Sequence, residues 1–281
     1  MRTLPQIVVE PVVRAALLED LGRSGDVTTD ACTPADATAR VALVARQPGV
    51  VAGLDCARLA WQLLDPHVTV EVQRPDGSRV EPGTTIAVAQ GSARALLTGE
   101  RVGLNLMGHL SGVATQTASI ADSIAHTRAV VVDTRKTTPG LRALEKYAVR
   151  CGGGRNHRFG LDDAVLLKDN HLAVAGGIRP AVQAVRREVG HMVKVEVEVD
   201  TLDQLQELLE LGVDAVLLDN MAPDVLREAV RMVDGRMLTE ASGGITPDSA
   251  PVIAESGVDM ISVGWLTHSA PVLDIGLDHL G

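Results

Sequence analysis

Short apolar runs alternate with amphipathic segments along the second half of the chain. The runs occupy residues 129–133, 164–168, 192–199, 215–219, 237–241 and 259–264. Between them lie segments whose apolar residues recur at helical spacing, such as 202–211 and 222–233. Continuous apolar strands joined by helices are typical of parallel sheets whose faces are covered. The pattern therefore predicts repeated βα units.

These units are too few for a complete eight-stranded α/β barrel. Such a barrel takes about 250 residues, whereas about 140 residues lie between 129 and 267. We therefore expect an α/β barrel with six or seven strands. A doubly wound open sheet is the structural alternative.

The first part of the chain has a different order of elements. Apolar spacing predicts a helix that starts at about Pro11, and the Pro48-Gly49 turn separates two short β-segments. Further on, the pattern predicts a helix at 54–64, strands at 68–73 and 84–90, and mainly helix at 92–126 with a break at Ser111-Gly112. This order indicates an α+β region with a mostly antiparallel sheet. It contains no evident acid–base cluster, so we expect a scaffold or a lid.

Polar residues stand at the C-terminal ends of the predicted parallel strands. They are Asp133, Arg135, Lys136, Lys168, Glu198, Asp219 and Ser242. Gly243 and Gly244 follow Ser242, and the last strand ends at Gly264. In parallel α/β folds, ligands bind at the carboxyl ends of the strands, because the loops that follow converge there. A single polar strand end is the usual entry to a loop, but the repetition indicates a shared site.

The strand at 192–200 carries two different faces. Side chains alternate along a strand, so its valines share one face and its charged residues share the other. The charged residues are Lys194, Glu196, Glu198 and Asp200. If helices cover the valine face, the charged face points into the barrel, where the charges must pair with each other, with basic groups or with a metal. The alternative is an exposed edge strand with a solvated face.

The segment that follows the strand at 237–241 resembles a phosphate-binding turn. Ser242, Gly243 and Gly244 precede Thr246-Pro247, which we expect to open a helix. Glycines let a phosphate approach backbone N–H groups, and a helix N-terminus adds partial positive charge. Glu198 and Asp219 suit a Mg²⁺ ion that bridges phosphates, because this cation prefers oxygen ligands. A purely structural capping role for Asp219 is the alternative.

A basic stretch lies in an otherwise acidic protein. Residues 133–171 hold eight Lys or Arg and five Asp or Glu, whereas the formal net charge of the chain is −10. Arg135, His157, Arg158 and Lys168 are suited to a planar ligand with two carboxylates, because Arg forks match carboxylates and Lys supplies a point charge. Thr138-Pro139 is a favourable helix start, and Gly152–Gly154 a favourable helix end.

Composition narrows the function classes. The basic excess is confined to one stretch of an acidic chain of 281 residues, which argues against nucleic acid as a partner. No apolar run reaches the roughly 18 residues of a membrane span, and the N-terminus lacks the pattern of a signal peptide. Three irregularly spaced cysteines argue against a disulfide framework or a zinc site. We expect a cytoplasmic protein.

Six segments together resemble one known enzyme family. They are DTRKTTPGLRALEKYAVRCGGGRNHRFGL, LLKDNH, VEVEVD, LLDN, EASGGI and VGWLTHS. In this order they resemble quinolinate phosphoribosyltransferase, a type II phosphoribosyltransferase of NAD biosynthesis. The N-terminal GDVTTD and GVVAG and the segment GERVGLNLMGHLSG also fit, so the resemblance covers essentially the whole chain.

The resemblance implies an architecture and a reaction. It implies an N-terminal α/β sandwich domain at residues 1–108, a seven-stranded incomplete α/β barrel at 109–267, and a tail at 268–281 that packs with the first domain. It further implies a homodimer or a hexamer, and the conversion of quinolinate and phosphoribosyl pyrophosphate to nicotinate mononucleotide, pyrophosphate and CO₂ with Mg²⁺.

The resemblance also implies roles for individual residues. Quinolinate would contact Arg101, Arg135, His157, Arg158 and Lys168, with Arg101 supplied by the partner subunit. Phosphoribosyl pyrophosphate would contact Lys136, Glu198, Asp219, Ser242, Gly243, Gly244, Gly264 and His268, with Mg²⁺ held by Glu198 and Asp219. The catalytic residues would be Lys136, Lys168, Glu198 and Asp219. Without the resemblance, Arg101 is read as an ordinary surface arginine. Trp265 stands where the family pattern suggests a small residue.

Two other functions remain open on the sequence. A barrel lyase could form a Schiff base through Lys168 if this lysine is desolvated. A non-catalytic relative could bind anions for transport or regulation. The hydrophobic run with paired acids that marks type I phosphoribosyltransferases is absent.

Overall fold

The computed structural model describes residues 3–280, which form two compact units. The first unit combines residues 3–118 with 137–153 and 266–280, and the second holds 119–136 and 154–265. The domain boundary expected after residue 108 falls inside α4 (Ala93–Ser123), which runs through this position without interruption. The first unit therefore also takes in residues 109–118 and the segment 137–153, both of which the sequence analysis gave to the barrel.

An antiparallel sheet forms one layer of the first unit. Its order is β12-β1-β5-β3, with β12 (Ile275–His279), β1 (Thr38–Ala45), β5 (Thr85–Ser92) and β3 (Thr69–Val72). β12 pairs with β1 from Val41↔His279 to Ala45↔Ile275, so the last strand of the chain belongs to the first sheet. A separate short ladder joins β2 (Gly49–Val50) and β4 (Arg79–Val80).

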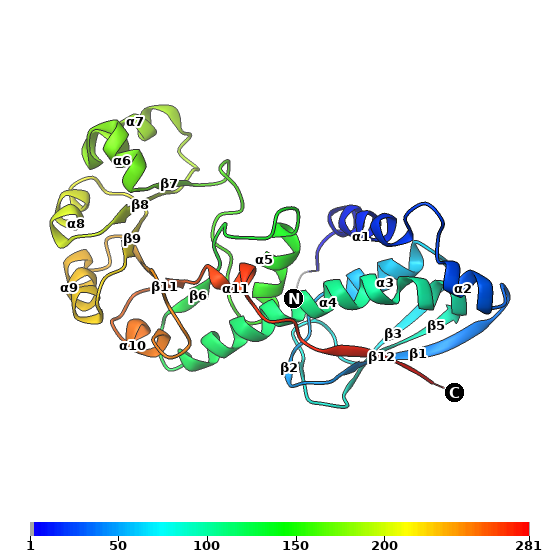
Figure 1. Cartoon of the computed structure of the whole chain (residues 1–281). Helices are drawn as coiled ribbons and strands as arrows, with labels where there is room; N and C mark the ends of the chain where they lie inside the picture. Colours follow the sequence, from blue (N-terminus) through cyan, green and yellow to red (C-terminus); the bar gives the residue numbers. More distant parts are fainter. Residues whose placement is uncertain (1–2, 281) are drawn as a thin grey trace. The chain divides into compact units, whose positions relative to one another are not determined.

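Helices cover this sheet in two steps. α3 (Leu54–Gln62) and α4 pack against it through buried Trp61, Leu96 and Met107. α1 (Gln6–Leu21) and α5 (Arg142–Cys151) pack on these helices through Val13 and Tyr147, while α2 (Val27–Cys32) follows α1 along the chain. Figure 1 shows α1, α3 and α4 on the same side of the sheet.

Two helix predictions for this unit were wrong. α1 begins at Gln6, so Pro11 lies inside the helix instead of at its start. α4 has no break at Ser111-Gly112. Instead, the Ser111 hydroxyl accepts a hydrogen bond from the Ala52 N–H at 2.9 Å and donates one to the Ala52 carbonyl at 3.1 Å. A Cβ added at Gly112 would lie 2.1 Å from the Pro271 carbonyl oxygen. Small residues stand here because other segments approach the helix closely.

The second unit is built on a parallel sheet. The strand order is β6-β11-β10-β9-β8-β7. The strands are β6 (Val130–Val132), β7 (Val165–Leu167), β8 (Val195–Val199), β9 (Ala215–Asp219), β10 (Leu238–Ser242) and β11 (Met260–Ser262). Consecutive strands from β7 to β11 are neighbours and the first strand lies beside the last. This winding is that of a barrel, since a doubly wound sheet reverses its strand order.

Six strands appear among the described residues, where the family pattern implies seven. Beside β6, the segment after α5 makes only an isolated parallel bridge between Val132 and Arg155. The connecting helices are α6 (Asp169–Ala175), α7 (Ile178–Glu188), α8 (Leu202–Leu209), α9 (Pro223–Val233) and α10 (Ala250–Ala254), with α11 (Trp265–His268) after β11. In Figure 1, α6 to α10 lie on the outer side of the strands. The α/β architecture expected from the sequence is confirmed.

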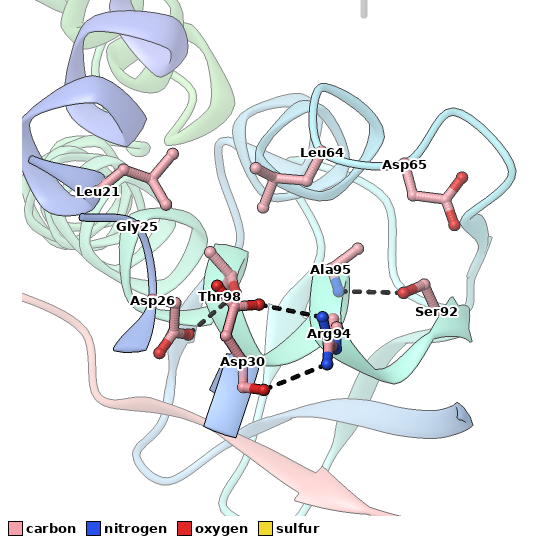
Figure 2. Close-up of a pocket in the computed structure, with 10 residues that line it drawn as sticks. All are labelled: Leu21, Gly25, Asp26, Asp30, Leu64, Asp65, Ser92, Arg94, Ala95 and Thr98. Atoms are coloured by element: carbon pink, nitrogen blue, oxygen red, sulfur yellow. Dashed lines mark hydrogen bonds and ion pairs between the residues drawn. The ribbon is translucent and has the colours of Figure 1, made fainter. Parts of the chain in front are cut away.

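The first unit contains a hollow of ≈ 240 Å³, shown in Figure 2. Two of its acidic side chains already have internal partners. Asp26 accepts a hydrogen bond from the Thr98 hydroxyl at 2.9 Å, and Asp30 lies 3.2 Å from the Arg94 guanidinium. These contacts hold α2 against the start of α4, so the hollow has a structural explanation. No helix within residues 3–280 has the length and apolar character that a bilayer crossing requires.

Candidate active site

The register of the parallel sheet brings Lys168 and Glu198 to the same level. Leu166 pairs with Glu196 and Leu167 with Val197, so Lys168 follows β7 at the position opposite Glu198. The Lys168 ammonium lies 3.7 Å from a Glu198 carboxylate oxygen. The lysine side chain is 48% exposed and that of Glu198 is 14% exposed. A cation open to solvent therefore faces a carboxylate that is mostly covered.

Asp219 and Ser242 extend this row across the sheet. Glu198 pairs with Leu217, and Asp219 stands two residues further along β9 on the same face. Asp219 itself pairs with Ser242 at the end of β10. Burial is the main cause that raises the pKa of Glu198; Lys168 lowers this pKa, and the negative charge of Asp219 raises it. The two acids therefore sense each other and offer oxygen ligands that suit a divalent cation such as Mg²⁺.

The turn after β10 has the backbone shape that two glycines permit. Gly243 and Gly244 have φ values of 104° and 58°, which L side chains rarely adopt. A Cβ at Gly243 would lie 2.1 Å from the side-chain oxygen of Asn220. The Asn220 side chain donates to the Asp219 carboxylate at 2.6 Å, and its backbone N–H donates to the Ser242 carbonyl at 2.9 Å. Asn220 thus ties Asp219 to the turn.

Trp265 holds the other side of the same turn. Its indole N–H donates to the Ile245 carbonyl at 2.8 Å. The large residue at this position therefore makes a specific contact with the glycine turn. The helix expected to open at Thr246-Pro247 starts later, because α10 begins at Ala250 after Ser249. In between, the Thr246 N–H donates to the Ser249 hydroxyl at 2.9 Å, which is a local turn.

Lys136 and Gly264 lie next to each other. A Cβ added at Gly264 would come within 2.8 Å of Cδ of Lys136, so the absence of a side chain there leaves room for the lysine. The backbone N–H of Lys136 donates to the Thr134 hydroxyl at 3.0 Å, which shapes the segment after β6. Two residues that the family pattern assigns to the phosphoribosyl donor are thereby in contact.

Arg135 and Arg158 form a concentration of positive charge. Burial lowers the pKa of Arg158, and the neighbouring Arg135 lowers it further. The Arg158 guanidinium donates to the Ala164 carbonyl at 3.0 Å, which uses one of its N–H groups. The Nε atom of Arg135 is buried and has no hydrogen-bond partner among the described residues. Two close guanidiniums with remaining donors are suited to bind an anion.

The His157 ring faces protein groups on both of its nitrogens. Nε2 lies 2.9 Å from a Glu196 carboxylate oxygen and 3.6 Å from Glu240. Nδ1 accepts a hydrogen bond from the Arg158 backbone N–H at 2.7 Å. The His157 backbone N–H donates to Asp133, which is fully buried, at 2.9 Å. That His157 contacts quinolinate stays a prediction.

The charged face of the strand at 192–200 divides in the structure. Glu196 and Glu198 lie within β8 and turn inward to His157 and Lys168, so the edge-strand alternative is wrong for them. Lys194 precedes β8; its side chain is 78% exposed and its ammonium lies 2.5 Å from Asp214. Asp200 lies beyond the strand and is exposed. Alternation along a strand holds only within the strand, which here is shorter than predicted.

Arg101 and His268 belong to the first unit. Arg101 lies in α4, where its side chain is 65% exposed and its guanidinium is 3.8 Å from Glu100. His268 ends α11, is exposed, and its Nδ1 lies 2.6 Å from the Ser269 hydroxyl. The helix start expected at Thr138-Pro139 is wrong, because α5 begins at Arg142. The helix does end at Gly152, as predicted.

Sequence reasoning gave no role to Glu240 or Asn220. Both had a signal: Glu240 is an acid inside an apolar run, two residues before Ser242 and hence on the same strand face. Asn220 directly follows Asp219, and asparagine tolerates the left-handed conformation found there, with a φ of 54°. Pattern rules assign such residues to a face, but they do not reveal their partners.

Comparison with known proteins places this geometry in one family. A family model for the N-terminal domain of quinolinate phosphoribosyl transferase matches residues 26–111, and one for its C-terminal domain matches 113–278. The chain is 46% identical over 274 residues to the nicotinate-nucleotide pyrophosphorylase [carboxylating] of Mycobacterium leprae, covering 95% of each chain. It is 44% identical over 261 residues to a probable enzyme of the same name from Bacillus subtilis, covering 93% of this chain and 90% of the relative.

Solved structures agree with the sequence matches. NadC from Streptococcus pyogenes superposes with a TM-score of 0.95 at 40% identity, with all of both chains covered. The nicotinate-nucleotide pyrophosphorylase from Francisella tularensis gives a TM-score of 0.94 at 37% identity, covering 99% of this chain and 98% of that one. Both domain models match in order, and relatives of similar length share the fold. This chain therefore belongs to the quinolinate phosphoribosyltransferase family.

Proposed function

We propose that this protein transfers the phosphoribosyl group of phosphoribosyl pyrophosphate to quinolinate, giving nicotinate mononucleotide, pyrophosphate and CO₂ for de novo NAD biosynthesis. Family membership supports the reaction. The observation that carries it is the row of Lys168, Glu198, Asp219 and Ser242 on one face of the parallel sheet, with Arg135 and Arg158 in the same unit. Positively charged side chains that can bind a dicarboxylate therefore occur together with acids that can stabilise a cation-like ribosyl carbon.

The positive residues suit the dicarboxylate substrate. Quinolinate carries two carboxylates on adjacent carbons of a pyridine ring, and Arg135, Arg158 and Lys168 supply guanidinium and ammonium donors for them. Holding the ring in place directs its nitrogen at the ribosyl carbon, and positioning of this kind supplies a large part of a rate enhancement. We propose that His157 also lines the quinolinate site, beside Arg158.

The chemical step needs no covalent nucleophile. The bond from the ribosyl carbon to pyrophosphate breaks and its electron pair leaves with pyrophosphate, while the pyridine nitrogen forms the new bond. Positive charge develops at the ribosyl carbon, and Glu198 and Asp219 are placed to stabilise it. The quaternised ring then accepts the electrons of the adjacent carboxylate bond, CO₂ leaves, and a proton replaces it on the ring carbon.

The donor side of the site fits phosphate and Mg²⁺. Small residues leave room for phosphates to approach the backbone, and they are Gly264 and the turn of Ser242, Gly243 and Gly244. Lys136 supplies a positive charge beside them. Glu198 and Asp219 would hold Mg²⁺, partly through the substrate, and the ion would neutralise charge on the departing pyrophosphate. We propose that His268 contributes to the same donor site.

We propose a homodimer, or a hexamer built from dimers, in which Arg101 completes the quinolinate site of the partner subunit. Its side chain is 65% exposed, which supports this role, and its guanidinium lies 3.8 Å from Glu100. Three free cysteines support a reducing, cytoplasmic location.

Replacing Lys168 tests the site directly. Lys168→Ala removes the ammonium that would hold a substrate carboxylate, so we expect turnover of quinolinate to fall by about 10²-fold or more. Lys194→Ala is the matched control, because Lys194 is exposed and pairs with Asp214. The assay follows CO₂ release from quinolinate with phosphoribosyl pyrophosphate and Mg²⁺. Normal turnover in Lys168→Ala would remove this lysine from the site.

Mixing two inactive variants tests the shared site. We expect Arg101→Ala to lack activity, and hybrid dimers with Lys168→Ala to regain part of it, because one of the two sites would then hold both intact residues. Subunit exchange is verified separately with tagged protein. Exchange without any recovery of CO₂ release would contradict the sharing of Arg101.

The Schiff-base lyase is not favoured by the surroundings of Lys168. The lysine is half-exposed and faces Glu198, so the desolvation that activates such lysines is missing. Turnover should therefore be insensitive to borohydride. A protein that binds quinolinate and phosphoribosyl pyrophosphate without releasing CO₂ would instead be a non-catalytic relative.

A further inference from the structure

We infer that Glu196 and Glu240 are positioning residues, which fix the His157 ring and through it the backbone of the anion-binding Arg158. The inference rests on the proposed function, because Arg158 is taken to hold quinolinate. His157, Glu196 and Glu240 are called the histidine cluster here. Their ligand-type atoms all lie within 4.8 Å of one another.

The hydrogen bonds determine how the His157 ring is used. A backbone N–H can only donate, so Nδ1 is the acceptor for Arg158 and carries no proton in this contact. Nε2 therefore bears the ring proton and donates it to Glu196 at 2.9 Å. The ring links a buried carboxylate to the peptide of the next residue. A histidine committed on both sides sets the direction in which Arg158 leaves the backbone.

Two further contacts, both made by Asp133, fix the segment 156–158. Asp133 accepts one hydrogen bond from the His157 backbone N–H at 2.9 Å and another from the Asn156 side chain at 2.6 Å. The Arg158 guanidinium then reaches the Ala164 carbonyl. The segment 156–158 has no helix or strand of its own to hold it. Side-chain contacts from neighbouring strands supply the rigidity that regular structure would otherwise give.

The histidine cluster lies one row beneath the candidate active site. Glu196 stands two residues before Glu198 on β8, and Glu240 stands two residues before Ser242 on β10. Both point to the same side of the sheet as Glu198 and Ser242. These two residues, with Lys168 and Asp219, form the upper row. Glu196 is 8% exposed and Glu240 is 1% exposed, whereas Lys168 above them is half-exposed. The lower row is closed to solvent, while the upper row is open to substrate.

Stability alone does not explain this arrangement. Both carboxylate oxygens of Glu240, and one of Glu196, are buried without a hydrogen-bond partner among the described residues. Apolar side chains of similar volume would fill the space at lower cost, because buried polar groups without partners are unfavourable. Burial, and then the charge of Glu196, raise the pKa of Glu240 to about 8, so its carboxyl group is neutral at pH 7.

Kinetics of substituted proteins test the inference. We expect Glu196→Ala to raise the KM for quinolinate about tenfold, the scale seen when groups that orient a ligand are removed. The KM for phosphoribosyl pyrophosphate should stay unchanged. Glu196→Gln should recover most of the loss, because its amide oxygen still accepts from Nε2 and its shape is the same. Glu240→Ala should likewise raise the KM for quinolinate, and Glu240→Gln should recover most of the loss. Glu210→Gln is the control, an exposed acid that pairs with Arg179 on the outer helices.

Nuclear magnetic resonance of the ring tests the geometry without any turnover. In protein labelled with ¹⁵N-histidine, the His157 signals, assigned with His157→Asn, should show the tautomer with hydrogen on Nε2. Glu196→Ala should shift these signals, whereas Glu210→Gln should not. If the protein does not turn over quinolinate at all, the proposed function fails, but the ring signals still decide on the histidine cluster. A proton on Nδ1, or an unchanged KM in both alanine variants, would overturn the inference.

A metal titration tests the remaining alternative, which is that the histidine cluster binds a metal ion. The same three residues could bind a divalent cation, so calorimetry with Zn²⁺ or Mn²⁺ alone is part of the test. We expect no stoichiometric binding that depends on Glu240. One bound ion per chain that is lost in Glu240→Gln and retained in Glu198→Gln would make the histidine cluster a metal site and overturn the positioning role.

Discussion

Two acids of the second unit, one on β8 and one on β10, have different surroundings. Glu198 has the Lys168 ammonium 3.7 Å away and solvent above it. Glu240 is enclosed, and Nε2 of the His157 ring lies 3.6 Å from its carboxylate. Burial therefore dominates at Glu240 and raises its pKa from 4.5 to about 8. At the scale of single residues, depth within the unit governs how far burial raises the pKa of a carboxyl group.

This shift gives a testable pH dependence of stability. The folded protein binds the Glu240 proton more tightly than the unfolded chain does, so this proton stabilises the fold below pH 4.5, and its contribution is lost as the pH rises to about 8. The free energy of unfolding should therefore fall relative to that of Glu240→Gln by more than about 1 kcal/mol over this range. Denaturant unfolding of both proteins at pH 5.5 and 8.5 measures the difference. An equal difference at both pH values would contradict a buried, neutral Glu240.

At the scale of elements, the turn after β10 depends on contacts from two other strands. Asn220 follows β9 and Trp265 follows β11, and each donates to a carbonyl within residues 242–245. The turn is thus held from both sides at the candidate phosphate site. A backbone fixed in this way can present its N–H groups to an anion without further ordering on binding.

A single methyl group at Gly243 should disturb this turn. Gly243→Ala places a Cβ 2.1 Å from Asn220 at a φ of 104°, so the turn and Asn220 must both shift. We expect a higher KM for phosphoribosyl pyrophosphate and a loss of about 1–3 kcal/mol of stability. Gly212→Ala has a φ of 62° but nothing within 4 Å, so it strains the backbone without a clash. Donor affinity that is equal in the two variants would argue against the turn as the phosphate site.

The sequence predicted element types better than element ends. Periodicity located the parallel strands and their helices, because alternation and helical spacing persist over whole elements. It misplaced the start of α1, because Pro11 is tolerated inside that helix, and it predicted a break in α4 where Ser111 bonds to Ala52. The upper row of the site followed from strand ends. The lower row did not, since the pairing of Glu240 with His157 depends on tertiary contacts that no local pattern contains.

At the scale of the whole molecule, the first unit is assembled from three separate stretches of chain. Its sheet includes β12, and its core includes Leu273 and Ile275 from the end of the chain. The two tryptophans are divided between the units: Trp61 is buried in the first, and Trp265 is partly buried in the second. Each unit therefore has its own spectroscopic probe.

Ile275→Ala should destabilise the first unit. Ile275 is 7% exposed and pairs with Ala45, so its truncation should cost about 2–4 kcal/mol. Val272→Ala is the control in the same tail, because Val272 is 60% exposed. Fluorescence of Trp61 in a Trp265→Phe background should report the loss during denaturant unfolding. Equal midpoints for the two variants would show that the tail contributes little to this core.

The pairing of β12 with β1 has a consequence for the newly made chain. A ribosome releases residues 38–45 long before residues 275–279 exist, so one edge of the first sheet stays open throughout most of translation. Open edges are templates for pairing with other chains. Synthesis halted shortly before the last strand should therefore yield an aggregation-prone product, even though every residue placed in the candidate active site has already been made.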